Sequence, residues 1–144
     1  DERRKEYNMK LKSSKTGTVG CVVLDRKGAL AVATSTGGKG FEIPGRVSDS
    51  ATIAGNYANK DCAVSCTGVG EDIINGALAC KIVTRVTDGQ SIESAFDKTF
   101  AELNEIAGFA GAIGIDSKGN VFQQESHPKI VFAAYDGEEV TLFE

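Results

Sequence analysis

Hydroxyl-bearing residues stand next to glycine at three points where an apolar stretch of the sequence begins or ends. Because a glycine has no Cβ, a ligand can approach its backbone closely, and each pair places a hydroxyl beside such an accessible backbone. Threonine is also common in strands, and glycine is common where strands stop, so any one pair also fits a structural role. The three pairs are Gly17-Thr18, Thr36-Gly37 and Thr67-Gly68.

A cation and an anion lie three positions apart in a segment with little helix or strand pattern. Arg46 can bind a carboxylate through two parallel hydrogen bonds, and Asp49 can accept hydrogen bonds from an ammonium group. Together the two side chains could hold both charged ends of an amino acid. An ordinary surface ion pair explains the same spacing equally well, so this motif alone decides nothing.

These residues depend on a scaffold that the hydrophobic pattern predicts to be α+β, with helices on one face of an antiparallel sheet. β-Branched runs around short turns predict hairpins. Apolar residues at three- and four-residue spacing predict two helices, the second with Ser91 as its N-cap, while residues 41–59 are expected to have little regular structure. The expected strands are 18–25, 29–36, 63–67, 109–115, 120–124, 130–135 and 139–143, and the expected helices are 71–86 and 92–106.

Charge divides the chain near its beginning. The net charge of −4 gives no reason to expect nucleic acid as a partner. Residues 1–17 hold six basic and three acidic residues, whereas the remaining residues hold ten and seventeen. Residues 1–17 are also polar and end in Ser-Ser-Lys-Thr-Gly, which is typical of a flexible linker. We therefore expect a linker at 1–17 and one folded domain at 18–144, with a simple basic arm as the other interpretation.

Cysteine and histidine usage argues against a metal site. The four cysteines, at positions 21, 62, 66 and 80, form no CxxC pair, and His127 is the only histidine, so a zinc site is poorly supported. Cysteines in apolar stretches are expected to be buried free thiols. Since neither a signal-peptide core nor an apolar stretch of ~18 residues occurs, a cytoplasmic protein is expected.

Two further motifs carry little weight. Pro128 places His127 in a turn and no acidic partner is evident, so a role for this histidine as a general base is not expected. The Gly-Gly-Lys-Gly run at 37–40 does not match a phosphate-binding loop, because Gly40 follows the lysine where that loop needs serine or threonine.

Four stretches, taken together and in order, resemble the start of the β-subunit of plant-type asparaginases and isoaspartyl peptidases. The likeness is strong from Thr18 to about Asp88 and looser toward the C-terminus. This family has the αββα sandwich of N-terminal-nucleophile hydrolases, so the resemblance implies that the chain supplies about half of such a sandwich. The stretches are 17–25 (GTVGCVVLD), 33–38 (ATSTGG), 44–50 (PGRVSDS), and 57–59 (YAN) with 63–71 (AVSCTGVGE).

The resemblance implies a precursor that cuts itself between Gly17 and Thr18, with residues 1–17 as the end of an α-subunit. Thr18 would then carry both nucleophile and base, because a threonine hydroxyl needs a base and a free α-amino group has a pKa of about 7.7–8.0. In the uncut chain that nitrogen belongs to an amide and cannot act as the base. Cleavage would use the same hydroxyl, which attacks the Gly17 carbonyl to form an ester that water hydrolyses.

The resemblance also assigns the other catalytic and binding residues. Thr36 would hydrogen-bond the hydroxyl or amine of the nucleophile, and Thr67 with the N–H of Gly68 would form the oxyanion hole and contact the substrate. Arg46 and Asp49 would hold the α-carboxylate and α-ammonium of an aspartyl or asparaginyl unit. The reaction would be hydrolysis of β-aspartyl dipeptides or L-asparagine through an enzyme ester.

The implied partners follow from the same family. The α-subunit of the same precursor would stay with the β-subunit, two such pairs would form an (αβ)2 assembly, and no membrane or nucleic acid would take part. No organic cofactor is implied, and a structural sodium ion would be bound by the α-subunit.

Departures from the family pattern lie near or beyond the leaving group. Ser48 replaces the usual glycine, the loop at 39–42 (KGFE) is unusual, and 124–128 (QESHP) replaces a Phe-Asn-Thr run. Phe41 and Glu42 could favour a basic leaving residue, as in β-aspartyl-arginine. Two other interpretations stay open: an endopeptidase similar to threonine aspartase, against which the absence of long insertions argues, and an uncleaved, non-catalytic member that acts in binding or assembly.

Overall fold

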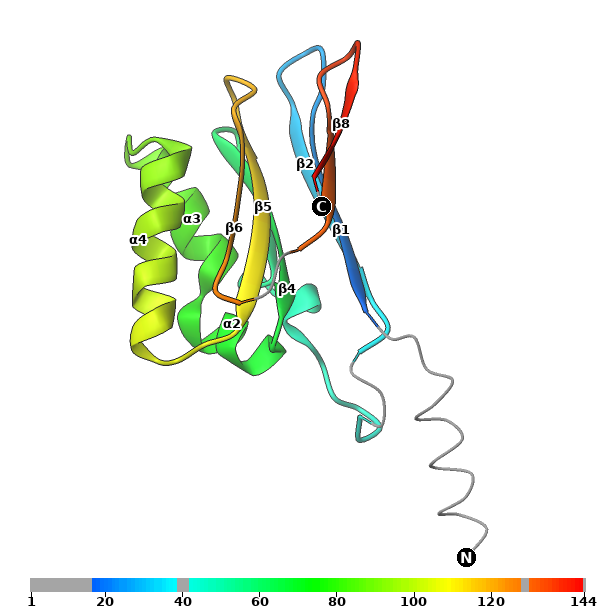
Figure 1. The fold of residues 1–144 in the computed structure, drawn as a ribbon, viewed down its shortest axis with the longest axis vertical. Coiled ribbons are helices and arrows are strands. Elements are labelled where there is room, and N and C mark those ends of the chain that lie inside the picture. The colour runs from blue at the N-terminus through cyan, green and yellow to red at the C-terminus, as the bar shows by residue number, and fades with distance from the viewer. Residues whose placement is uncertain (1–16, 39–41, 128–129, 144) are drawn as a thin grey trace, which may run out of the picture.

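The computed structural model describes residues 17–38, 42–127 and 130–143. Its layers follow one another as helices, a four-stranded antiparallel sheet, and a layer that contains two hairpins (Figure 1). The expected α+β fold, with helices on one face of an antiparallel sheet, is confirmed. The described residues supply one helix layer of an αββα sandwich and do not include a second. The expected linker at 1–17, apart from Gly17, and the loop segment 39–41 lie outside the described residues.

The strands occupy nearly the segments that the sequence predicts. Antiparallel pairs join β1 to β2, β5 to β6 and β7 to β8, and the four-stranded sheet has the order β3-β4-β5-β6. The strands are β1 (Thr18–Leu24), β2 (Leu30–Thr36), β3 (Asn56–Ala58), β4 (Cys62–Gly68), β5 (Ala110–Asp116), β6 (Val121–Glu125), β7 (Phe132–Tyr135) and β8 (Val140–Phe143).

The turn between β1 and β2 explains why this hairpin forms. The Asp25 carboxylate accepts hydrogen bonds from the backbone N–H groups of Lys27 and Ala29, at 2.7 and 2.8 Å. Gly28 has φ +82°, a left-handed conformation that glycine adopts without strain. The turn thereby fixes the register of β1 against β2.

The prediction of little regular structure at residues 41–59 is wrong in two places. A short 3-10 helix, η1 (Asp49–Ala51), and the edge strand β3 both lie within this segment. The side-chain amide of Asn56 donates through Nδ2 to the Ser50 backbone carbonyl at 2.7 Å, and β3 pairs with β4. These contacts join the segment to itself and to a buried strand, so the local sequence pattern does not show them.

The single helix predicted at 71–86 is two helices, α2 (Gly70–Gly76) and α3 (Leu78–Thr87). Ala77 between them is left-handed, with φ 50°, and its N–H bonds back to α2 as a helix C-cap does. The apolar periodicity continues across the break and therefore hides it. The other predicted helix is confirmed as α4 (Ile92–Glu105), and its N-cap is Ser91 as expected.

Aromatic side chains fill the space between the helices and the four-stranded sheet. Phe96 and Phe100, one turn apart on α4, are buried and stack with ring centroids 6.2 Å apart. Phe122 of β6 meets Phe96 edge-on at 5.2 Å. Gly114 of β5 leaves room for the Phe96 ring, because a Cβ there would lie 2.9 Å from it. This core holds the helices on one face of the sheet and leaves the other face for the hairpin layer.

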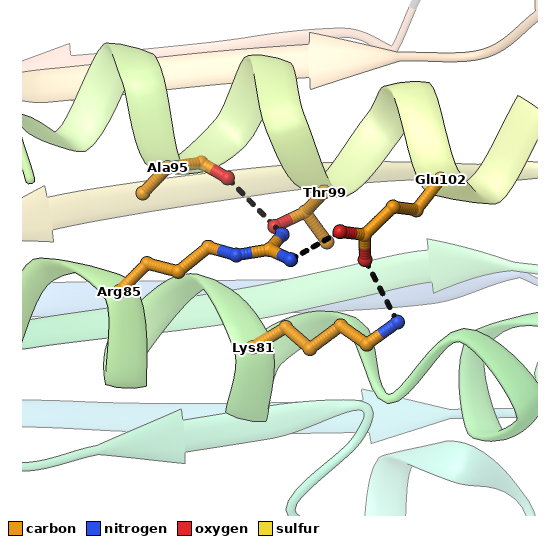
Figure 2. A network of polar contacts seen from close by, with 5 residues as sticks. All are labelled: Lys81, Arg85, Ala95, Thr99 and Glu102. Atoms are coloured by element: carbon orange, nitrogen blue, oxygen red, sulfur yellow. Dashed lines mark hydrogen bonds and ion pairs between the residues drawn. The ribbon is translucent and has the colours of Figure 1, made fainter.

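Figure 2 shows a polar network that joins α3 to α4. Glu102 of α4 accepts a hydrogen bond from Lys81 Nζ at 2.9 Å and also pairs with Arg85 of α3. Arg85 donates in addition to Thr99, whose hydroxyl donates to the Ala95 carbonyl at 2.6 Å. The hydrogen bond from Lys81 is the main cause that lowers the pKa of Glu102. The network ties the two helices together within their layer.

Candidate active site

The open end of the first hairpin brings Thr18 and Thr36 together. The two residues are directly opposite in the register of β1 and β2, and the Thr18 hydroxyl donates to Thr36 Oγ1 at 3.1 Å. Thr36 Oγ1 also accepts the backbone N–H of Gly38 at 3.0 Å. Gly38 has φ +73°, a left-handed backbone conformation that glycine adopts without strain. The expected contact of the two threonines is present, and their catalytic roles stay predictions.

Thr67 reaches the same place from a different sheet. It lies near the end of β4, whose contacts include both strands of the first hairpin. A cavity of about 340 Å³ is lined by Thr18 and Thr67, with Ile113 of β5 and Phe132 of β7 among its walls. The structure therefore gathers two of the three predicted hydroxyls around one cavity, and the third, on Thr36, bonds to the first.

Gly68 follows Thr67 in a conformation that requires glycine. Its φ is +136°, and a Cβ there would lie 2.5 Å from the carbonyl oxygen of Phe109. The next residue, Val69, donates its N–H to that same carbonyl at 2.9 Å. The backbone at the end of β4 is thus held close to the start of β5, which fixes where the Gly68 amide lies.

One hydroxyl pair that the sequence reasoning missed anchors the hairpin to the sheet. Thr34 Oγ1 and Ser65 Oγ lie 2.7 Å apart, and a Cβ on Gly20 would come within 2.1 Å of Ser65 Oγ. Each partner stands two residues before a predicted site threonine, so strand alternation places it on the same face. That alternation is a signal from which the pair could have been predicted.

Arg46 is paired with Glu71 rather than with Asp49. Its Nη2 and Nε lie 2.7 and 3.2 Å from Glu71 Oε1, so an ion pair between residues 46 and 49 is not what the structure contains. Asp49 and Arg46 nevertheless converge on one point. A Cβ on Gly70 would lie 2.8 Å from Asp49 Oδ1 and 3.1 Å from Arg46 Nη2. The Glu71 partner was missed because sequence spacing gives no sign of a contact across 25 positions.

The pKa values of Asp49 and Arg46 are both raised, but for different physical reasons. Asp49 is only 6% exposed, its Oδ2 has no hydrogen-bond partner among the residues that the structure describes, and burial is the main cause that raises its pKa. The hydrogen bond to Glu71 is the main cause that raises the pKa of Arg46. A buried carboxylate with an unpaired oxygen gains much from a cationic partner, so an ammonium group would be well bound beside Asp49.

A larger open cleft of about 620 Å³ lies toward the other end of β4 and β5. Its walls come from the loop between α3 and α4 and from the turn between β5 and β6. None of the predicted site residues lines it. His127, which sequence reasoning set aside, is exposed, stacks on Phe109 at 5.1 Å and contacts the Ser126 hydroxyl.

The four cysteines are free thiols, as expected, but they are not all buried. Cys62 and Cys66 of β4 are buried, and burial raises the pKa of Cys62 to about 12 and raises that of Cys66 as well. Cys80 is half-buried, and Cys21 is exposed because it points to the outer face of the first hairpin. Among the described residues, no three His, Cys, Asp or Glu side chains are grouped as metal ligands, and no helix is long and apolar enough to cross a membrane.

Helices on a sheet that faces a second strand layer, with threonine hydroxyls meeting between the strand layers, are the arrangement expected of the N-terminal-nucleophile hydrolase fold. The chain belongs to the asparaginase family, since the model of that family matches residues 1–143.

Three relatives carry names that agree with this family. The isoaspartyl peptidase/L-asparaginase of Nostoc sp. is 53% identical over 124 residues, which are 86% of this chain and 39% of the relative. The protein of the same name from Synechocystis sp. is 49% identical over 124 residues, 86% of this chain and 38% of the relative. Escherichia coli isoaspartyl peptidase is 48% identical over 112 residues, 74% and 35% respectively. The chain thus spans less than two fifths of their length.

Proposed function

We propose that this chain is the catalytic portion of a hydrolase that acts on β-aspartyl dipeptides, on L-asparagine or on both, with Thr18 as nucleophile. The observation that carries the proposal is the hydroxyl contact of Thr18 with Thr36 at the edge of a cavity that Thr67 also lines. The names of the relatives support the substrate class.

The proposed chemistry begins with a cut between Gly17 and Thr18, which frees the α-amino group. That amine takes the proton from Thr18 Oγ, directly or through a water, while Oγ attacks the side-chain carbonyl of the substrate. The Thr67 hydroxyl and the Gly68 N–H receive the oxyanion, and losing one such donor typically costs 10²–10³ in rate. The Thr18 ammonium returns this proton to the leaving nitrogen, which departs as the amine or ammonia, and water then hydrolyses the β-aspartyl ester.

Arg46 and Asp49 are the proposed anchors for the substrate. Glu71 accepts hydrogen bonds from Nε and Nη2 of Arg46, and the proposal assigns the α-carboxylate to the other N–H groups of this guanidinium. The buried Asp49 would take the α-ammonium, which compensates for its burial. Because both side chains converge on Gly70, a larger residue there would fill the binding space.

The partner in this proposal is the α-subunit of the same precursor, and two such pairs form an (αβ)2 assembly. Support comes from the outward face of the first hairpin, where Val19 is 73% and Val23 is 47% exposed, beside exposed Cys21, Ala31 and Ala33. An apolar strip of this kind marks an interaction surface. No organic cofactor enters the proposed reaction, and a structural sodium ion would be bound by the α-subunit.

Intact-mass spectrometry of the full-length protein tests the proposal. Wild type and Thr18→Ser, which keeps a hydroxyl, should yield a fragment that begins at residue 18 and should hydrolyse β-aspartyl dipeptides. Thr18→Ala should stay uncut and inactive. A wild-type chain that stays intact would support the non-catalytic alternative, and cleavage of folded proteins after aspartate would support the endopeptidase alternative.

A further inference from the structure

The carbonyl oxygen of Gly17, which belongs to the bond proposed to be cut, has a backbone hydrogen-bond donor in the first hairpin. The N–H of Gly37 donates to it at 3.0 Å. This contact extends the antiparallel ladder by one step beyond the pair Thr18 and Thr36, so the same register that joins the two hydroxyls also fixes this donor.

Two successive amides therefore serve the two reacting groups. The Gly37 N–H binds the electrophilic carbonyl, and the Gly38 N–H binds Thr36 Oγ1, which in turn accepts the hydroxyl of the nucleophile. A backbone donor of this kind is held rigidly by the strand pair and needs no reorganisation when charge develops on the oxygen.

We propose that the backbone N–H of Gly37 is the oxyanion donor for self-cleavage, a role distinct from that of Thr67 and Gly68 in turnover. The proposal rests on the proposed function. Thr18 Oγ forms a bond to the Gly17 carbonyl carbon, and the negative charge on the carbonyl oxygen is stabilised by the Gly37 N–H. The bond from carbon to the Thr18 nitrogen then breaks, and the proton from Oγ ends on that nitrogen. Water hydrolyses the ester to the Gly17 carboxylate and the free Thr18 hydroxyl.

A separation of maturation from turnover follows from this geometry. Once the ester is hydrolysed, the Gly17 carboxylate is no longer bonded to Thr18, and the substrate carbonyl is served by the donors at the end of β4. Loss of the Gly37 N–H should therefore slow cleavage far more than it slows turnover by an enzyme that has been cut by other means.

The test compares Gly37→Pro, which removes the N–H, with Gly37→Ala, which keeps it, in the full-length protein. Cleavage is followed by intact mass after purification from a short expression. We expect Gly37→Pro to slow cleavage by about 10²-fold or more, and Gly37→Ala to restore most of the rate. Equal cleavage rates for the proline variant and wild type would overturn the proposal.

A second arm excludes misfolding. An added protease site directly before Thr18 frees the α-amine in both variants, and hydrolysis of a β-aspartyl dipeptide is measured. We expect turnover to fall by less than about tenfold in Gly37→Pro, and an equal loss of cleavage and turnover would overturn the proposal. If pre-cut wild type has no turnover while cleavage still depends on this N–H, the proposed function fails and the present inference stands. If the proline variant does not fold, an ester in place of the amide at residue 37, introduced by semisynthesis, gives the same comparison.

Discussion

Three atoms define the site at the scale of single residues: the hydroxyl oxygens of Thr18 and Thr36 and the amide nitrogen of Gly38. The Gly38 N–H donates a hydrogen bond to Thr36 Oγ1 and thereby restricts rotation of the Thr36 side chain. The Thr18 hydroxyl therefore donates to an oxygen whose position is fixed. Such a fixed acceptor orients the nucleophile without being a strong base. The base in this account is the nitrogen of Thr18 itself.

Removal of the Thr36 hydroxyl tests its orienting role. Thr36→Val keeps the shape of the strand but cannot accept the hydrogen bond of Thr18, so we expect kcat to fall by about 10²-fold. Thr36→Ser, which retains the oxygen, should recover most of the rate. Equal kcat values for the valine variant and wild type, both in fully cleaved form, would show that the contact does not orient the nucleophile.

Asp49 gives a prediction with a defined pH dependence. Burial raises its pKa in the folded protein, so its contribution to stability is present below its unfolded pKa and is lost as pH rises through the raised folded value. Asp49→Asn carries no charge, and we expect it to increase the free energy of unfolding at pH 7, with no gain below the ordinary aspartate pKa of ~3.9. Urea unfolding across this pH range checks the trend.

The same variant should bind substrate less well, since the partner of the α-ammonium is neutral. A gain in stability with a loss in affinity is expected of a residue kept for function. A variant that is less stable than wild type at pH 7, or an unchanged KM, would contradict this account of Asp49.

Residue types singled out the threonines and the charged residues Arg46 and Asp49 as candidates, because each stands at a strand end or in a loop. Sequence alone could not predict that Arg46 pairs with Glu71, since a loop meets a helix there. The sequence also predicted that Cys21 is buried, because it lies in an apolar strand. The structure instead exposes Cys21 on the outer face of the first hairpin.

Two features of the secondary structure position the site: the fixed register of the first hairpin, and the break between helices α2 and α3. The break at Ala77 separates α2, whose first residue Gly70 lies beside Arg46 and Asp49, from α3, which packs in the core. Strand pairs were predictable from turn residues and alternation. The break was not, because an alanine in a continuous apolar pattern gives no signal of a left-handed backbone.

Substitution at the break tests its conformation. Ala77 has φ 50°, where glycine is favoured, so we expect Ala77→Gly to stabilise the protein by about 0.5–1 kcal/mol. Ala101, exposed within α4, is the matched control, and Ala101→Gly should destabilise by about 1 kcal/mol. Thermal unfolding measures both, and a destabilised Ala77→Gly would mean that α2 and α3 form one helix.

The residues that the structure describes form three layers, and the outer face of the first hairpin is apolar. The order of strands and helices in the sequence predicted helices on one face of a sheet. It could not predict how the first hairpin stacks on that sheet, because the contacts between Thr34 and Ser65 join segments 31 positions apart.

A charge on the outer face of the first hairpin should disrupt the proposed assembly with the α-subunit. Val23, 47% exposed, lies on this face of the first hairpin, and Ile106, 54% exposed, is the C-cap residue of α4. We expect Val23→Asp to weaken association of the two cleaved chains by about tenfold or more, whereas Ile106→Asp should have a much smaller effect, since burying an unpaired charge is costly. Co-purification of tagged chains measures this, and equal effects of the two variants would argue against this face.

The central claim is that one threonine supplies both the hydroxyl nucleophile and an unblocked nitrogen as its base. Freshly purified full-length protein can be sampled as it matures, with mass spectrometry giving the fraction that begins at Thr18 and β-aspartyl dipeptide hydrolysis giving the rate in the same samples. The account predicts a rate that rises in proportion to that fraction and extrapolates to zero when no chain is cut. Full turnover while Thr18 is still joined to Gly17 would contradict it.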